Sequence, residues 1–269
     1  GEGEGEGEGE GEGEGEGEGD DFIGTWGVLM SIAITECGLP LVNCNDSYLF
    51  HYGLLYITES GSDLELNVNW CAINPKSFAY VEEGADELAW VVYPEAFIES
   101  IQSPYYRISD RPSFMSGSNF STSTFLEARG VVLNDIENDE LPNLSNASSD
   151  SRIFDQDEDG FPGMTLQMAG VLVAQSYVVQ KWSSSLEGEV VDLSKIQGLI
   201  GDLMYESEII GASAHDFEVD TETNVHEDSN RSYFRLLRMK GNASCEDVLK
   251  ESESESSWLH PIVQMEIEN

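Results

Sequence analysis

Positive charge is scarce in this chain of 269 residues. Only 12 Lys and Arg stand against 52 Asp and Glu, which gives a formal net charge of −40 at pH 7. A chain with this charge repels nucleic acid and anionic membrane surfaces, so no nucleic-acid partner is expected. The same excess of acid makes a divalent cation the most natural small partner.

Long hydrophobic runs and familiar catalytic motifs are also missing. The longest apolar candidate, residues 168–179, contains Gln175 and Ser176, and a transmembrane helix needs about 20 apolar residues, so no transmembrane segment is expected. The sequence has no G-x-S-x-G nucleophile elbow, no H-E-x-x-H zinc motif, no P-loop and no G-x-G-x-x-G after a strand. We therefore expect a protein that is not an enzyme.

Cysteine is rare, and no two cysteines form a C-x-x-C pair. The spacing of the four cysteines argues against zinc or thioredoxin-like chemistry and favours two disulfides. They are Cys37, Cys44, Cys71 and Cys245. Of the three possible pairings we favour Cys37–Cys44, a clip across a hairpin mouth, and Cys71–Cys245, which ties the C-terminal segment to an early strand. Disulfides indicate an extracytoplasmic location: secreted, periplasmic or at the cell surface.

Residues 1–19 alternate strictly between Gly and Glu. Nine like charges repel one another and no apolar side chain is available for burial, so residues 1–20 are expected to be a disordered, solvated tether. A single β-rich domain is expected over 21–269. The repeat resembles the acidic spacer that follows the lipidated cysteine of bacterial lipoproteins, although that cysteine is not present, and the resemblance implies membrane tethering.

Short strands recur between turn signals in the rest of the chain. Leu64, Leu66, Val68 and Trp70 alternate with polar residues, as in a half-buried strand. Helices are expected only over 94–101 and 245–250, and residues 103–151 are expected to be surface loops with one strand near 128–133. Further strands are expected at 25–35, 48–58, 63–72, 88–93, 164–170, 175–182, 196–204, 208–212, 232–240 and 262–267. This pattern predicts an all-β fold, either an antiparallel calycin-like β-barrel or a sandwich, with long loops and a short C-terminal helix.

The first expected strand opens with Gly24-Thr25-Trp26, which resembles the G-x-W motif at the start of lipocalins and other calycins. The resemblance implies a barrel whose Trp closes one end and is covered by an Arg of the last strand, here Arg235 or Arg238. It also implies a carrier of small apolar ligands. A C-terminal helix linked by a disulfide to an early strand, here through Cys245 and Cys71, is similar as well.

A second resemblance rests on residues spread over the later half of the chain. The chain resembles uncharacterised acidic lipoproteins of myxobacteria-type bacteria at five places: the block 155–163, Gln180-Lys181, Gly198, Gly211-Ala212-Ser213 and the late Cys245. This resemblance implies an exported location and a β-rich fold, and it implies no activity.

The strongest chemical motif is a run of aspartates at alternate positions. Asp155, Asp157 and Asp159 are followed by Gly160, and carboxylates at this spacing can converge on one hard cation where a glycine permits a sharp turn. The carbonyl of Phe161 is expected as a further ligand. Because all donors are oxygens, the motif predicts Ca²⁺.

The surroundings of this motif limit its role. Leu166 stands where an EF-hand has its bidentate Glu, and a strand is expected to follow, so the motif does not belong to a helix–loop–helix pair. The four His residues are scattered, which favours a structural ion over a catalytic one. A further carboxylate is expected from Asp150, Asp139 or Glu140. The alternative is an acidic, solvated turn.

Two other groups of residues allow weaker interpretations. Asp216, Glu218, Asp220 and Glu222 alternate along the chain and could form a second cation site or a glycosidase-like pair, or simply a solvated strand face. Tyr105, Tyr106 and Tyr177 could line a ligand pocket or serve as packing.

Three functions follow from these patterns. The first is an exported, tethered, non-enzymatic module for binding or envelope architecture, stiffened by a structural Ca²⁺. The second is a carrier of a small apolar ligand, which predicts an internal cavity. The third is a hydrolase that uses carboxylates, which requires two carboxyl groups facing each other across a cleft. The partners expected are thus a divalent cation and either a small apolar ligand or an envelope component.

Overall fold

The computed structural model describes residues 21–37, 44–77, 89–109, 111–170, 173–215, 218 and 222–262. The expected tether over 1–20 lies outside the described residues, as does all but the first residue of the expected strand 262–267.

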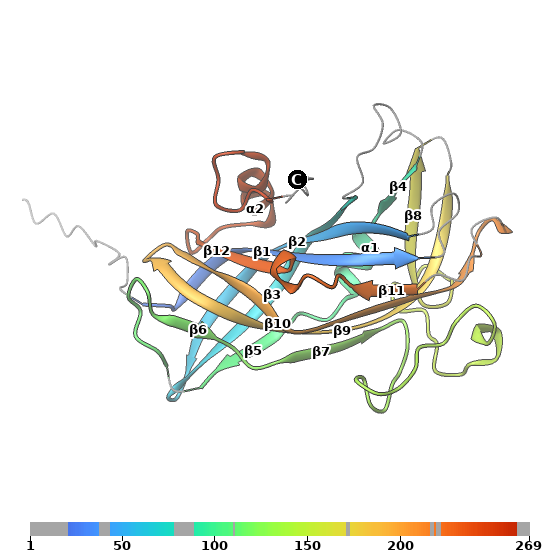
Figure 1. Ribbon diagram of the computed structural model, residues 1–269, viewed down its shortest axis with the longest axis horizontal. Helices are drawn as coiled ribbons and strands as arrows, with labels where there is room; N and C mark the ends of the chain where they lie inside the picture. The colour runs from blue at the N-terminus through green and yellow to red at the C-terminus, as the bar shows by residue number, and fades with distance from the viewer. Residues whose placement is uncertain are drawn as a thin grey trace, which may run out of the picture.

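The described strands form one 12-stranded antiparallel sheet that curls into a half-barrel (Figure 1). The prediction of an all-β, barrel-like fold is therefore confirmed. The main path across the sheet is β4 (Ala89–Val92), β8 (Met164–Gly170), β9 (Ala174–Asp192), β10 (Lys195–Ala212), β12 (Tyr233–Arg238), β1 (Gly24–Cys37), β2 (Cys44–Ser60), β3 (Asp63–Ser77) and β5 (Tyr105–Ile108).

Three short strands lie off this path. β6 (Asn119–Ser121) and β7 (Phe125–Arg129) pair with β9, and β11 (Glu222–Val225) pairs with β1. The described helices are α1 (Glu95–Ser100) and α2 (Cys245–Glu253), with 3₁₀ turns at Ala147–Ser149 and Ser229–Arg231. Both predicted helices are thus present.

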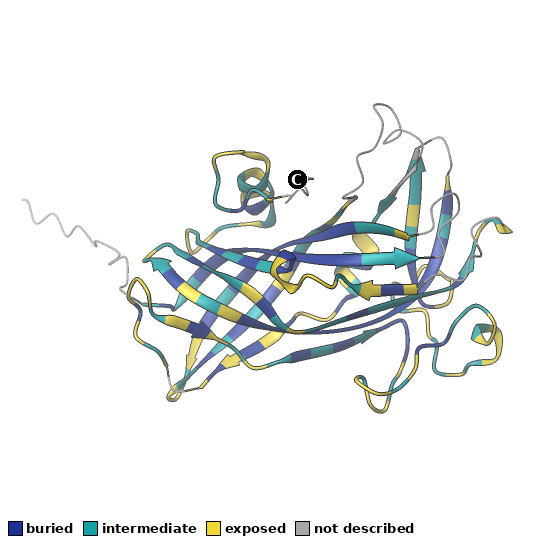
Figure 2. Ribbon diagram, viewed as in Figure 1, coloured by how far each residue is buried: buried dark blue, intermediate teal, exposed yellow. Residues whose placement is uncertain are grey.

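β1 lies at the centre of the sheet and is buried on both faces. Every residue from Thr25 to Ile34 is buried (Figure 2). Its inner side chains, such as Trp26 and Met30, belong to the main core, whereas Leu29 and Ala33 belong to a second cluster on the outer face. A strand covered on both faces is apolar throughout rather than alternating, which accounts for the continuous apolar sequence here.

The outer cluster is covered by α2 and the residues after it. Val248 and Leu259 are fully buried against Leu29 and Phe50. α2 begins at a capping box, in which the Ser244 and Asp247 side chains each bond the other residue's backbone N–H. The helix is therefore fixed at its start as well as by its packing.

The sheet closes along part of its length only. β5 pairs with β3 over Leu64–Asn67, and the Ser123 N–H donates to the Arg107 carbonyl at 2.8 Å, which joins β5 to the segment between β6 and β7. β8, β7 and β6 in turn occupy one edge of β9. Beyond this closure, the part of β3 from Trp70 onward faces β4 and α1.

Two local expectations were wrong. Residues 103–151 were expected to hold one strand near 128–133, but the chain forms β5, β6 and β7, and β7 ends at Arg129. Residues 196–204 and 208–212 were expected as two strands, yet they belong to the single strand β10, whose register shifts between Gly201 and Met204. A local bulge, rather than a turn, absorbs the irregular pattern.

β9 is also longer than the predicted strand over 175–182. It continues through three serines to Gly188, where it passes so close to β10 that a Cβ on Gly198 would lie 2.1 Å from the Glu187 carbonyl oxygen. The glycines here are required by this close approach and do not mark a turn.

Trp26 lies at one end of the half-barrel, fully buried, and its Nε1 donates to the Phe22 carbonyl at 2.9 Å. The guanidinium of Arg238, its cross-strand neighbour, lies 4.5 Å from the centre of the indole ring. Arg235 lies over Trp258 instead, at 5.0 Å. Of the two candidate arginines, Arg238 is the one that covers Trp26.

Both disulfides pair as favoured from the sequence. Cys37–Cys44 joins the ends of β1 and β2, and Cys71–Cys245 fixes α2 to β3 across a sequence separation of 174 residues. Since disulfides persist in oxidising compartments, the two bonds indicate an extracytoplasmic protein.

The two disulfides are expected to differ in their contribution to stability. Loop-closure entropy predicts a loss of about 5 kcal/mol in the free energy of unfolding for Cys71→Ser/Cys245→Ser, against about 2.5 kcal/mol for Cys37→Ser/Cys44→Ser, because the longer loop constrains the unfolded chain more. Urea unfolding of the two double variants measures this difference. A larger loss from the short clip would contradict it.

Candidate functional site

The three aspartates of the alternating run converge in space. One carboxylate oxygen from each of Asp155, Asp157 and Asp159 lies within 4.8 Å of the others. Among the described residues, this is the group of acidic, His or Cys side chains whose spacing suits a metal ion. The arrangement supplies only oxygen donors, which suit a hard cation such as Ca²⁺.

The backbone of this loop is held in shape by its own carboxylates. Asp155 accepts bonds from the backbone N–H groups of Asp159 and Gly160, at 3.2 and 2.8 Å. Gly160 has φ +91°, a conformation that L side chains rarely adopt, so the turn that brings the aspartates together depends on glycine here. At the loop's base, residues 155 and 163 form a parallel bridge.

Gln156 fixes the base of the loop to the rest of the fold. Its Oε1 accepts from the Gly130 N–H at 2.7 Å, and its Nε2 donates to the Ser100 carbonyl at 2.9 Å. On the other side, the ring of Phe161 stacks on Tyr177, with centroids 4.6 Å apart. The loop is therefore held against the rest of the fold on both sides, by the hydrogen bonds of Gln156 and by the stacking of Phe161.

Asp157 is the least solvated of the three acids. Its Oδ2 accepts from the Thr165 N–H at 2.9 Å, whereas its Oδ1 is buried and has no partner among the described residues. Burial raises the pKa of Asp157, and the charges of Asp159 and Asp155 add to the effect. A buried oxygen without a donor is the kind of group that a cation would satisfy.

The acids expected to complete this group lie elsewhere. Asp150 pairs with Arg152 at 2.7 Å, which together with hydrogen bonds holds the pKa of Asp150 below its usual range. Asp139 accepts from the backbone N–H groups of Asn134 and Asp135. Neither of them, nor Glu140, belongs to the converging group. The expectation of a fourth carboxylate from these three residues was wrong.

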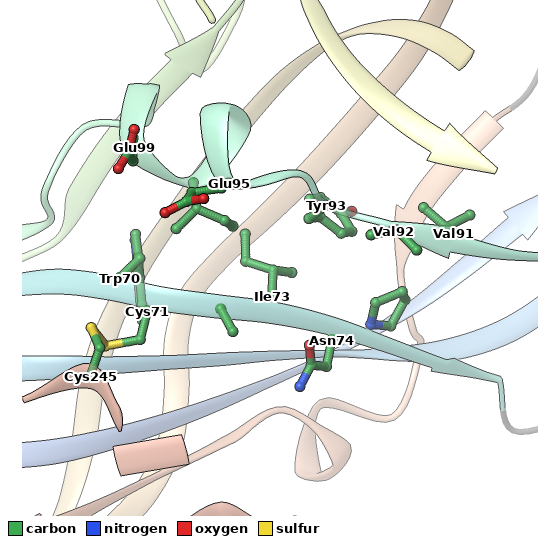
Figure 3. Close-up of a pocket in the computed structure, with 13 residues that line it drawn as sticks. Trp70, Cys71, Ile73, Asn74, Val91, Val92, Tyr93, Glu95, Glu99 and Cys245 are labelled. Atoms are coloured by element: carbon green, nitrogen blue, oxygen red, sulfur yellow. A yellow bond between two sulfur atoms is a disulfide. The ribbon is translucent and has the colours of Figure 1, made fainter. Parts of the chain in front are cut away.

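A cleft of about 660 Å³ lies where β3 faces β4 and α1 (Figure 3). Trp70 and Ile73 rise from β3 toward α1, and Glu95 and Glu99 come from the helix. The cleft is lined by Trp70, Cys71, Ala72, Ile73, Asn74, Pro75, Val91, Val92, Tyr93, Glu95, Ile98, Glu99 and Cys245. Its walls are largely apolar and its charged groups are acids.

Trp70 and Tyr93 connect this cleft to the interior. Trp70 is 9% exposed, and its indole N–H is buried without a hydrogen-bond partner among the described residues. The ring of Tyr93 lines the cleft, while burial of its hydroxyl raises its pKa to about 12, against the effect of hydrogen bonds with Tyr205 and Gln180. The Tyr93 hydroxyl thus lies near polar side chains inside the half-barrel, whereas the Trp70 ring belongs to the main core.

A buried ion pair lies in that interior. Glu127 and Arg129, alternate residues of β7, are 2% and 1% exposed and pair at 2.8 Å. Glu127 also accepts from Trp182 Nε1 at 2.6 Å and from the Gln102 N–H at 2.7 Å. Neither residue was predicted as a site residue, because the sequence shows only two opposite charges at alternate positions.

His51 packs against the same group. Its ring stacks on Trp182 with centroids 5.9 Å apart and meets Trp70 edge-on at 5.3 Å. Burial lowers the pKa of His51 to about 3, and the positive charge of Arg129 contributes, against the effect of a hydrogen bond with the Leu49 carbonyl. His51 is therefore neutral in the folded protein at physiological pH.

The remaining candidates do not form a shared site. Tyr106 is fully buried in the main core, Tyr105 is 43% exposed and Tyr177 stacks on Phe161, so the three tyrosines do not line one pocket. Asp216 and Asp220 lie outside the described residues. Of the other two acids in that run, Glu218 contacts His215, and Glu222 opens β11.

Comparisons with protein-family models, with curated proteins and with solved structures found no match. No described helix is long and apolar enough to span a membrane. Two features of the described residues bear on function, the aspartate loop and the cleft beside β3.

The buried His51 is expected to make stability fall with acid. The pKa of His51 in the fold, about 3, lies below the unfolded value of 6.5. Between these values the unfolded state binds a proton that the folded state does not. The contribution of neutral His51 to the free energy of unfolding is therefore complete above pH 6.5 and is lost as pH falls toward 3. Between about pH 5.5 and 4, the loss of stability of wild type relative to His51→Phe should approach about 1.4 kcal/mol per pH unit. Chemical unfolding of both proteins at several pH values measures this, and parallel pH curves would refute it.

Loss of Arg129 is expected to destabilise the fold strongly. Arg129→Met leaves Glu127 buried without its countercharge and should lower the free energy of unfolding by about 3–5 kcal/mol, part of which Glu127→Leu/Arg129→Met recovers. The matched control is Arg152→Met, which breaks a more exposed pair with Asp150 and should cost less than about 1 kcal/mol. Equal losses for the two single variants in urea unfolding would contradict the assignment.

Proposed function

We propose that this protein is an exported, non-enzymatic binding module in which the 155–163 loop holds a structural Ca²⁺. The Gly-Glu segment serves as its tether to an envelope surface. The observation that carries the proposal is the convergence of three carboxylates in a loop whose backbone is already closed around them. Three acids this close repel one another unless a cation or protons compensate their charge.

The position of the loop supports a structural role for the ion. The loop leads directly into β8, and Thr165 of that strand donates to Asp157. The Gln156 side chain joins the loop's base to the carbonyl of Ser100, the last residue of α1. Occupation of the loop would therefore stiffen one end of β8 and the C-terminal end of α1.

The second candidate function is that of a carrier for a small ligand. The cleft between β3 and the β4–α1 segment favours it, because apolar residues and two aromatic rings line a volume of about 660 Å³. The concave face of the sheet is itself packed by large side chains such as Trp26, Phe120 and Trp182. We therefore propose that the ligand binds in this lateral cleft and not along the axis of the half-barrel.

Calcium is expected to stabilise wild type and to have no effect on Asp157→Asn. At a concentration 100 times the Kd, bound Ca²⁺ raises the free energy of unfolding by about 2.7 kcal/mol. Without calcium the variant should be at least as stable as wild type, because it removes one of three repelling charges and keeps an acceptor for Thr165. Thermal unfolding with Ca²⁺, with Mg²⁺ and with chelator measures both effects.

The matched control for this experiment is Asp150→Asn, which changes an acid outside the converging group and should respond to Ca²⁺ as wild type does. An unchanged melting temperature of wild type after chelation, or an equal response in Asp157→Asn, would count against the calcium site.

A further inference from the structure

The charge of the cleft walls identifies the class of ligand that suits them. Among the described residues that line the cleft, none is Lys, Arg or His, whereas Glu95 and Glu99 are both present and exposed. These two acids are four residues apart on α1, so they lie on one face of the helix. The cleft therefore combines an apolar interior with a negatively charged rim.

We propose that the cleft binds an organic cation, that is, an amine with an apolar or aromatic body. This inference rests on the second candidate function, the binding of a small ligand in the cleft. The body packs between Ile73, Val92 and Ile98, next to the aromatic rings of Trp70 and Tyr93. The ammonium group remains at the rim, where it meets Glu95 and Glu99.

Three physical effects act in the same direction. The carboxylates of Glu95 and Glu99 at the rim attract the ammonium group. The net charge of −40 adds a long-range attraction for cations and repels carboxylates of the same size. Burial of the hydrocarbon body is a favourable contribution that does not depend on charge.

The neutral interior below the cleft agrees with this assignment. The positive charge of Arg129 is compensated by Glu127, and the low pKa of His51 leaves that ring uncharged at neutral pH. No uncompensated positive group among these residues repels a cation, and none is left to recruit an anion.

The test uses three probes with one body and three charges: 4-phenylbutylamine, 4-phenylbutanol and 4-phenylbutyrate. Titration calorimetry and tryptophan fluorescence at low salt give the affinities. The amine should bind about tenfold more tightly than the alcohol, and the acid more weakly than the alcohol. The advantage of the amine should shrink as salt is added.

Charge variants separate the rim from the general charge of the protein. Glu95→Gln/Glu99→Gln should bring the affinity for the amine to within about twofold of that for the alcohol and leave the alcohol's affinity unchanged. The matched control is Glu137→Gln/Glu140→Gln, which removes two exposed acids between β7 and β8 that do not line the cleft and should leave the preference intact. Equal effects of the two double variants, or tighter binding of the acid than of the amine, would overturn the proposal.

A steric variant locates the binding. Ile98→Arg, or Val91→Trp if the first does not fold, should abolish binding of all three probes. If the alcohol binds in the cleft and the amine has no advantage, the charge assignment fails and the carrier function stands. If no probe binds, or if both steric variants bind as wild type does, the carrier function fails together with the charge assignment.

Discussion

The buried carboxylate of Glu127 organises the interior of this half-barrel. It accepts hydrogen bonds from Arg129, from the Trp182 indole and from the backbone of Gln102, just after α1. A charge with so little exposure is tolerated only when it is paired and bonded in this way. The cost of leaving it uncompensated therefore fixes the relative positions of β7, β9 and the end of α1.

The interior and the surface solve opposite electrostatic problems. Inside, Glu127 is paired with Arg129 and His51 is neutral, so these three groups together carry no net charge. Outside, acids greatly outnumber bases, and the excess must be screened by dissolved ions or relieved by bound ones. The aspartate loop and the acidic rim of the cleft are two places where the carboxylates are arranged so that a bound cation could compensate their charge.

Much of the fold could be predicted from local patterns. The alternation of Leu64, Leu66 and Val68 correctly predicted a half-buried strand, and the favoured cysteine pairs are the ones observed. The convergence of Asp155, Asp157 and Asp159 was also predictable, because the three acids lie within five residues and Gly160 permits the turn. Features that depend on residues close together in the sequence could therefore be predicted.

The features that could not be predicted depend on partners distant in sequence. The serines of β9 form a strand because β7 and β10 lie beside them, and no local pattern reports those neighbours. The walls of the cleft come from β3, β4, α1 and Cys245, which meet only when the sheet has curled. Charge matching such as Glu127 with Arg129 likewise becomes visible only when both are known to point inward.

The side-chain amide of Gln156 reaches across 56 positions of sequence to the last residue of α1. The aspartate loop and α1, which forms one wall of the cleft, are therefore directly connected, although a long stretch of chain separates them. A displacement at either end would strain this bond and the neighbouring hydrogen bond from the Ser100 hydroxyl to the Met164 sulfur of β8.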